Sequence, residues 1–289
     1  VYFKRNPVVA IGNASVSVNM GNSLSITITG DNSVGILAST VDPTTLPALT
    51  GGSGNVSVTT GSGSITVNAG NGTDVYNSLP LSAGIAAVSN GGNVDVYAGG
   101  GLFGSLNITV HSGNFSNIGT VGIVGVTDGS GNVTIAHGTA LGGGTITADN
   151  GDGVTARAVD GNIDVTELGK IYAGGGVNGG DGINAEIAGN GSILVNLGLG
   201  SINVSGAADH DGIHADIVNG GNGSITIGST GAPFFGIEGS INANGDGIFA
   251  TTDGHGNIDV TTGLLNSINS TDGNGVEVSN TSGVTGNIT

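Results

Sequence analysis

Short stretches in which apolar and polar residues alternate recur along the chain, and one of them begins with nearly the same four residues each time. This first phrase is Gly, then Ile or Val, then a variable residue, then usually Ala, and from Gly122 onward its copies lie about 30 residues apart. Repetition at a fixed period of this size is typical of solenoid proteins. Five clear copies stand at Gly84–Ala87, Gly153–Ala156, Gly182–Ala185, Gly212–Ala215 and Gly247–Ala250.

Two further alternating phrases lie between successive copies of the first. One reads Gly-Asn-Val/Ile-x-Val/Ile, as at 161–165, and the other reads Gly-Ser/Thr-Ile-x-Val/Ala, as at 200–204. Alternation with a period of two predicts short, half-buried strands. The Gly, Asn and Asp residues between the phrases tolerate the left-handed backbone that a sharp corner needs. We therefore predict an all-β parallel β-helix (β-solenoid) with three short strands per turn of about 30 residues, and about eight turns.

The phase of the phrases predicts which side chains stack inside the coil. The second residue of the first phrase is expected to stack on its counterparts, as Ile85, Ile123, Val154, Ile183, Ile213 and Ile248. The fourth residue is expected to form a column of small residues, as Ala87, Gly125, Ala156, Ala185, Ala215 and Ala250. Stacked turns of this kind share one continuous apolar core.

The repeat is less regular in the first third of the chain. We assign residues 31–289 to the β-helix, and residues 1–30, which lack the first phrase, to an N-terminal partial turn or cap. Corner insertions are expected near 40–50, 74–82 and 229–238, where Pro residues and altered spacing interrupt the repeat. Such insertions serve either as a binding face or as tolerated surface loops. Because the last residues begin a strand phrase and then stop, we expect the chain to be a piece of something longer.

Composition removes several classes of function. The 289 residues include 60 Gly and no Cys, but 37% are hydrophobic and stand in phase, which opposes disorder. The formal net charge is -17 and only four residues are basic, so no basic stripe exists to bind nucleic acid or an anionic membrane surface. No apolar run approaches the roughly 20 residues that a membrane helix needs, so we expect no direct membrane insertion by this segment.

A column of acidic residues is the sharpest polar feature. Asp152, Asp181, Asp211 and Asp246 each precede the Gly of the first phrase, and Asn274 follows in register. Two interpretations stay open. The carboxylates bind a hard cation, with weak calcium sites along the column, or each is a corner residue that accepts a hydrogen bond from nearby backbone N–H groups. Asn274 favours the corner interpretation, because an amide does the same without a metal.

The segment 209–214 is the only dense group of His and Asp residues. His210 and His214 are candidate ligands for a transition metal if both face the same way, but position 214 points outward in the strand phrase, which favours a solvated corner. Sugar hydrolysis needs paired carboxylates in different environments, which the acidic column supplies geometrically. However, the acids repeat rather than stand alone, and the chain has no Trp to stack on sugars. We therefore expect no enzymatic activity and no cofactor, apart from the calcium alternative.

Several phrases resemble the passenger domains of Gram-negative autotransporters (type V secretion) of the pertactin-like and adhesin kind. The resemblance rests on Gly180–Ala185, Gly161–Val165 and Gly200–Asn203, and it covers about residues 30–289. It implies a right-handed β-helix on the bacterial cell surface or outside the cell, with roles in adhesion, aggregation or biofilm formation. The implied partners are a protein or glycan on a host or neighbouring cell, or a second copy of the chain. A carbohydrate-active β-helix and a self-assembling filament subunit are the alternatives.

Overall fold

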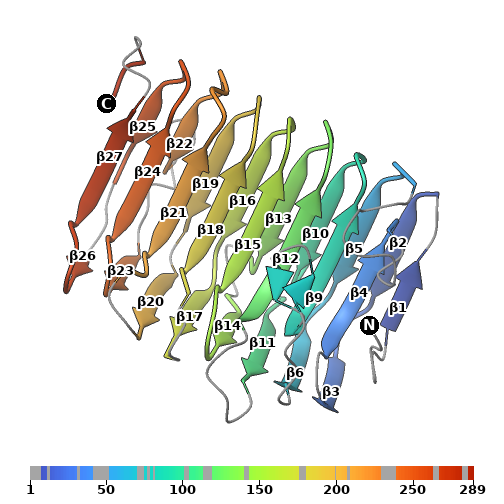
Figure 1. Ribbon diagram of the computed structural model, residues 1–289. Coiled ribbons are helices and arrows are strands. Elements are labelled where there is room, and N and C mark those ends of the chain that lie inside the picture. The colour runs from blue at the N-terminus through green and yellow to red at the C-terminus, as the bar shows by residue number, and fades with distance from the viewer. Residues whose placement is uncertain are drawn as a thin grey trace.

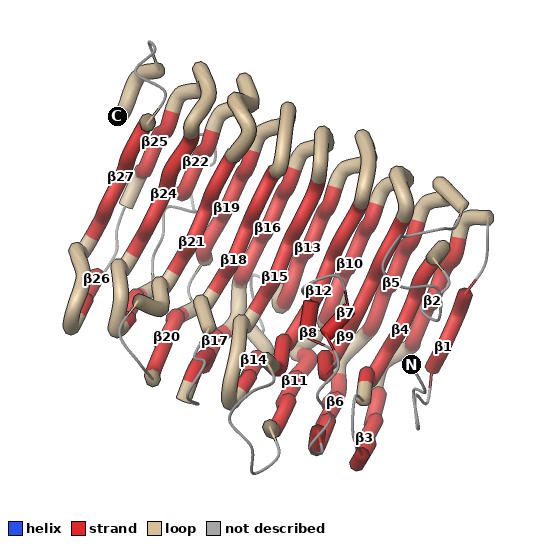
Figure 2. Tube along the Cα trace, viewed as in Figure 1, coloured by secondary structure: helices blue, strands red, loops and turns tan. Residues whose placement is uncertain are grey.

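The chain folds into a coil in which every regular element is a β-strand, within the part of the chain that the structure describes (Figure 1). Strands and connecting loops alternate in the same order from one turn to the next (Figure 2). The computed structural model describes residues 8–11, 14–30, 33–41, 52–69, 75–76, 79–80, 82–100, 104–112, 119–139, 143–175, 180–198, 200–206, 209–228, 239–262, 267–281 and 286–289.

Three parallel sheets, which we call A, B and C, run along the coil, and each turn adds one strand to each sheet. Sheet A consists of β1 (Val8–Ile11), β4 (Val34–Ser39), β9 (Ser82–Ser89), β12 (Thr120–Thr127), β15 (Val154–Ala158), β18 (Ile183–Ile187), β21 (Ile213–Ile217), β24 (Ile248–Thr252) and β27 (Val276–Asn280). Sheet B consists of β2 (Val16–Met20), β5 (Val56–Thr60), β10 (Val94–Ala98), β13 (Val133–His137), β16 (Ile163–Glu167), β19 (Ile193–Leu197), β22 (Ile225–Ile227) and β25 (Ile258–Val260). Sheet C consists of β3 (Leu24–Gly30), β6 (Gly63–Ala69), β11 (Leu106–His111), β14 (Thr145–Ala148), β17 (Lys170–Gly174), β20 (Ser201–Ser205), β23 (Ser240–Ala243) and β26 (Ser267–Ser270).

This topology confirms the predicted right-handed parallel β-helix with three short strands per turn (Figure 1). The predicted columns are also confirmed. Val154 pairs with Ile183, Ile183 with Ile213, and Ile213 with Ile248, and all four side chains are fully buried. Ala156, Ala185, Ala215 and Ala250 stack in the same way and are equally buried. Because parallel strands in register place identical positions over one another, each turn covers the apolar residues of the turn before it.

The Gly that opens the first phrase is required by the close approach of neighbouring turns. A Cβ atom on Gly182 would lie 2.2 Å from Cγ2 of Ile202 and 2.4 Å from the carbonyl oxygen of Gly212. Gly153 and Gly212 are confined in the same way by Ile171 and Ile241. Any larger residue would push sheet A away from the side chains of sheet C, so this position excludes a side chain.

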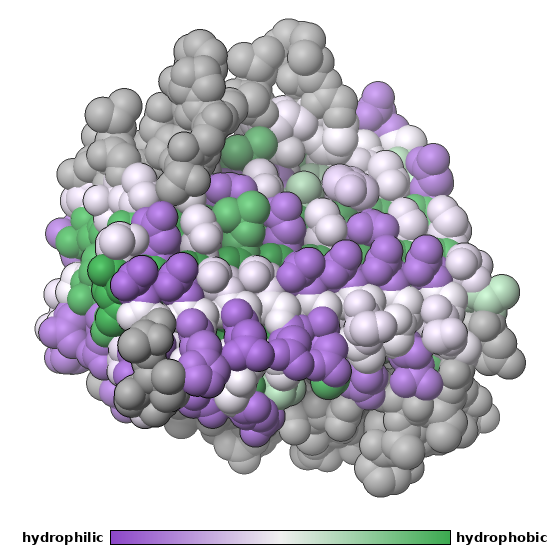
Figure 3. Space-filling model, turned by 90° about the horizontal axis from the view of Figure 1, so that it is seen from above, coloured by the Kyte–Doolittle hydropathy of each residue, from purple (hydrophilic) through white to green (hydrophobic). Residues whose placement is uncertain are grey.

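A row of hydrogen bonds, which we call the neutral ladder, holds the corners before the strands of sheet B. At each corner a side-chain oxygen of Asn or Ser accepts the backbone N–H of the matching residue one turn later, over 2.9–3.4 Å. Seen from above, hydrophilic residues form rows along the coil (Figure 3). The members of the neutral ladder are Ser15, Asn55, Asn93, Asn132, Asn162, Ser192, Ser224, Asn257 and Asn287.

The segments expected to differ from the repeat are described only in part. Within residues 1–30, β1, β2 and β3 supply one strand to each of the three sheets. In the predicted insertion near 74–82, β7 (Val75–Tyr76) and β8 (Leu79–Pro80) form a two-stranded antiparallel sheet. Residues 42–51, which hold most of the insertion near 40–50, lie outside the described residues, as does the whole of 229–238.

The outer face of sheet A changes character along the coil, and this change positions the candidate site. In β4, β9 and β12 the outward positions carry Leu37, Ala86 and Val124, which are buried in a second apolar cluster outside the main core. In β15, β18 and β21 the same outward position carries Thr155, Asn184 and His214 instead, and Phe249 follows in β24. The polar part of this face therefore lies in the later turns, beside the acidic column.

Candidate functional site

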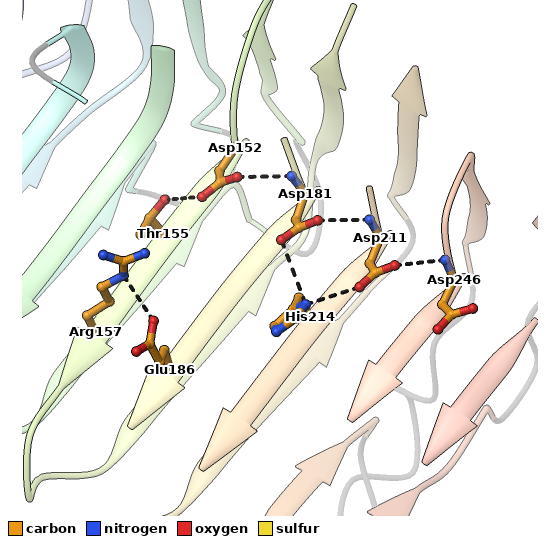
Figure 4. Close-up of polar contacts among 8 residues, drawn as sticks. All are labelled: Asp152, Thr155, Arg157, Asp181, Glu186, Asp211, His214 and Asp246. Atoms are coloured by element: carbon orange, nitrogen blue, oxygen red, sulfur yellow. Dashed lines mark hydrogen bonds and ion pairs between the residues drawn. The ribbon is translucent and has the colours of Figure 1, made fainter. Parts of the chain in front are cut away.

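The structure brings the four acids of the column into one row at the starts of β15, β18, β21 and β24 (Figure 4). Each carboxylate accepts a backbone N–H from the next turn on its Oδ1 atom. The N–H of Asp181 donates to Asp152 over 2.9 Å, that of Asp211 to Asp181 over 2.8 Å, and that of Asp246 to Asp211 over 2.7 Å. Asn274 donates to Asp246 in the same way. The corner role that the sequence suggested for these residues is therefore present in the structure.

The backbone hydrogen bond does not require a charge. In the neutral ladder, Oδ1 of Asn132 accepts the N–H of Asn162 over 2.9 Å. Oδ1 of Asp181 accepts the N–H of Asp211 in the same way. A carboxylate is costly to bury, whereas an amide makes the same bond without the cost of desolvating a charge. The acidic row is thus more highly charged than its structural role demands.

The acids of this row are largely removed from solvent, and burial raises the pKa of Asp152 and Asp181. Asp211 is only 8% exposed. Burial, followed by the neighbouring charge of Asp152, raises the pKa of Asp181 to about 7. Burial also raises the pKa of Asp152, although hydrogen bonds from Thr155 and from the backbone of Asp181 oppose it. At neutral pH Asp181 is therefore only partly ionised.

The second oxygens of the carboxylates point to different partners. Oδ2 of Asp152 accepts the hydroxyl hydrogen of Thr155 over 2.7 Å. The Nδ1 atom of His214 lies 3.1 Å from Oδ2 of Asp211 and 4.0 Å from Oδ2 of Asp181, and Figure 4 shows the imidazole between the two carboxylates. One ligand atom from each of these three residues lies within 4.8 Å of the other two. We call Asp181, Asp211 and His214 the triad.

The imidazole of His214 is held from both sides. Burial alone lowers its pKa, but the hydrogen bond to Asp211 and the charges of Asp181 and Asp211 outweigh burial, so the pKa of His214 is raised. The ring of Phe249 in the next turn packs against the imidazole, with 4.9 Å between the ring centroids. The triad lines an open hollow of about 340 Å³, together with Asp209, His210, Asp246, Phe249 and Asp272.

The predicted site residues therefore separate into two groups. Asp181 and Asp211 join His214 in the triad, while Asp152 turns its second oxygen to Thr155 in β15, the strand that follows it. Asp246 lines the hollow without belonging to the triad, and His210 does the same. His214, expected at a solvated corner, has a side chain that is 31% exposed.

Sequence reasoning missed a buried pair in the core. Nδ1 of His137 lies 2.7 Å from Oε1 of Glu167, its Nε2 lies 2.9 Å from the carbonyl oxygen of Leu106, and both side chains are buried. Oε1 of Glu167 also accepts the N–H of Gly169, while the buried Oε2 has no hydrogen-bond partner. The signal was available, because both residues occupy the inward phase of the second strand phrase and pair in register.

No helix in the described ranges is long and apolar enough to cross a membrane. Comparisons of the chain with family models, with curated proteins and with solved structures found no match.

Proposed function

We propose that this chain is a non-enzymatic rod, displayed on a bacterial surface or secreted, that mediates adhesion, aggregation or biofilm contacts. The observation that carries the proposal is the uniform register of the coil, which repeats corner Asn and Ser side chains along the neutral ladder. A solenoid offers an extended surface instead of one deep pocket. Many identical weak contacts along a shaft add up to strong attachment when they engage together.

The polar rows support this proposal because they repeat a hydrogen-bonding pattern over successive turns. On sheet C the side-chain amide of Asn242 donates to Asn203 over 2.9 Å, and that of Asn269 donates to Asn242 over 2.7 Å. Amides aligned in this way present donors and acceptors to a glycan or to a protein surface. The acidic net charge would keep separate rods in solution apart until such specific contacts form.

A whole-turn deletion tests the proposal. Removal of residues 247–274, which contain β24, β25 and β26, joins Asp246 to Gly275 and preserves the Asp-Gly corner. Beads coated with the parent chain or the shortened chain would be tested for attachment to bacterial cells, epithelial cells and immobilised glycans. We expect the shortened chain to retain most of the attachment, with far-UV circular dichroism as the control for folding. Loss of all attachment through one point substitution in the hollow would contradict a distributed surface.

Light scattering against protein concentration measures self-association in the same samples.

One observation favours a second candidate, a carbohydrate-active enzyme. Asp181 has a pKa raised to about 7 and lies beside the carboxylate of Asp211, in a hollow open to solvent. Glycoside hydrolysis uses two neighbouring carboxyl groups in different environments, one of which acts as a general acid. Incubation with a panel of neutral and acidic polysaccharides, followed by assays for reducing ends and unsaturated products, decides the matter. Absence of turnover across the panel rejects this candidate, and turnover abolished by Asp181→Asn would establish it.

A further inference from the structure

We infer that Asp181, Asp211 and His214 form a binding site for a divalent transition-metal ion such as Zn²⁺. The three residues come from two successive turns of the coil and converge at the wall of the hollow (Figure 4). The inference goes beyond the adhesive function proposed above and does not depend on it.

The spacing of the ligand atoms fits a small tetrahedral ion. Zn²⁺ holds imidazole nitrogen and carboxylate oxygen at about 2.0–2.2 Å, which places neighbouring ligand atoms about 3.3 Å apart. The separations of 3.1 Å and 4.0 Å between Nδ1 of His214 and the two carboxylate oxygens bracket that value. Three protein ligands beside an open hollow leave a fourth position for water or for a group from a partner.

The carboxylates of the triad are already oriented for this role. Backbone N–H groups of the next turn hold Oδ1 of Asp181 and Oδ1 of Asp211, so each residue directs Oδ2 toward His214. The ring of Phe249 supports the imidazole from the following turn. Outer contacts of this kind fix ligand orientation in metal sites and reduce the loss of conformational entropy on binding.

An independent observation points to a bound cation. The neutral ladder makes the same backbone bond with Asn and Ser, so the carboxylates of Asp181 and Asp211 are unnecessary for the corner. Their side chains are only 13% and 11% exposed, and buried carboxylates need a compensating charge. Within the described part of the chain, neither carboxylate forms an ion pair with Lys or Arg, and the nearby Arg157 pairs with Glu186. The ion-pair partner of both carboxylates is His214, which carries a charge only when it is protonated. A divalent cation bound to the neutral imidazole would take the place of the His214 proton and give the two carboxylates two positive charges instead of one.

The donor set distinguishes this site from the calcium sites expected along the column. Ca²⁺ takes six to eight oxygen ligands, whereas the triad offers two oxygens and one nitrogen. Imidazole with carboxylate suits Zn²⁺ and neighbouring transition metals. Asp152 is directed away from the triad toward Thr155, so the four acids do not act as one continuous ligand set.

Titration of the full chain, purified without a histidine tag and stripped of metal with a chelator, tests the inference. We expect one Zn²⁺ per chain by calorimetry, and Co²⁺ should give the intense visible absorption of a tetrahedral site. His214→Ala, Asp211→Asn and Asp181→Asn should each weaken binding by more than the roughly 10–100-fold that loss of a supporting residue costs. The Asn variants keep the oxygen that accepts the backbone N–H, so they should remain folded.

Two matched controls separate the triad from the general acidity of the chain. Asp152→Asn changes the same column position one turn earlier, and His111→Ala removes an exposed His that pairs with Asp149. Both should bind Zn²⁺ like the parent chain. The inference is overturned if the parent chain shows no saturable one-to-one binding. It is also overturned if folded His214→Ala binds as the parent does, or if Asp152→Asn weakens binding as much as Asp211→Asn.

Discussion

Two His–carboxylate pairs in this protein have the same distance between nitrogen and oxygen, but one pair is buried and the other is exposed. A comparison of the two therefore measures how burial changes the contribution of such a pair to stability. In both pairs Nδ1 of His lies 2.7 Å from a carboxylate oxygen. The side chains of His137 and Glu167 are 0% and 1% exposed, whereas those of His111 and Asp149 are 48% and 39% exposed. We predict that Glu167→Gln costs much more stability than Asp149→Asn.

The magnitude follows from what each substitution leaves behind. Nε2 of His137 faces the carbonyl oxygen of Leu106, which can only accept, so Nε2 donates there. When Nδ1 also carries hydrogen and donates to the carboxylate of Glu167, the ring is a cation, and the raised pKa of His137 favours this form. Removing one partner of a buried ion pair costs about 3–5 kcal/mol, because the other charge stays buried and unpaired. Breaking an exposed pair costs about 0–1 kcal/mol.

The pH dependence has a definite sign. Burial by itself lowers the pKa of His137, but the charge and hydrogen bond of Glu167 and the hydrogen bond to Leu106 raise it above its ordinary value of 6.5. The stabilisation from this His is therefore complete below pH 6.5 and is lost as pH rises through the higher pKa of the folded state. The penalty for Glu167→Gln should accordingly be larger at pH 6 than at pH 9.

Urea unfolding followed by far-UV circular dichroism, at pH 6 and pH 9, measures these differences when all variants share one m-value. An apolar double substitution, His137→Leu with Glu167→Met, provides a further comparison, because a buried ion pair replaced by packed apolar groups is often neutral or stabilising. The double variant should be more stable than Glu167→Gln alone. Equal losses for Glu167→Gln and Asp149→Asn would refute the reasoning.

Three further predictions concern the repeat itself. In metal-free protein the raised pKa of Asp181 makes the free energy of unfolding increase as pH falls from about 7 toward 3.8, and this stabilisation is absent above pH 7. Asp181→Asn should therefore raise the melting temperature at pH 8 and reduce the change of melting temperature with pH. Gly182→Ala should cost about 1–3 kcal/mol in urea unfolding through overpacking, while Gly275→Ala, where a Cβ meets nothing within 4 Å, should not show this loss. Asn132→Ala should cost about 1 kcal/mol by leaving the N–H of Asn162 without its acceptor, and Asn132→Ser should cost less, because Ser192 makes the same kind of bond two corners later; hydrogen exchange at the amide of Asn162 checks both.

The repeat made most of the fold predictable. The phrase that opens at Gly182 identified the inward Ile183 and the small Ala185, and both occupy the predicted columns. The same phase placed Asp181 and Asp211 at equivalent corners, so their common row was also expected. The pairing of His137 with Glu167 was not predicted, although both residues stand in the inward phase and pair in register.

What the sequence by itself determined was the local alternation, because a strand backbone turns successive side chains to opposite faces whatever surrounds it. Only the tertiary structure decided how the corner residues meet across turns. His214 faces outward by its own phase, yet it lies between the carboxylates of Asp181 and Asp211. The ring of Phe249 packs against the imidazole of His214, although the two residues are 35 positions apart in the chain and the turn between them is lengthened by several residues. Such contacts depend on the stacking of whole turns, and a repeat pattern records that the turns stack but not which atoms then come within reach.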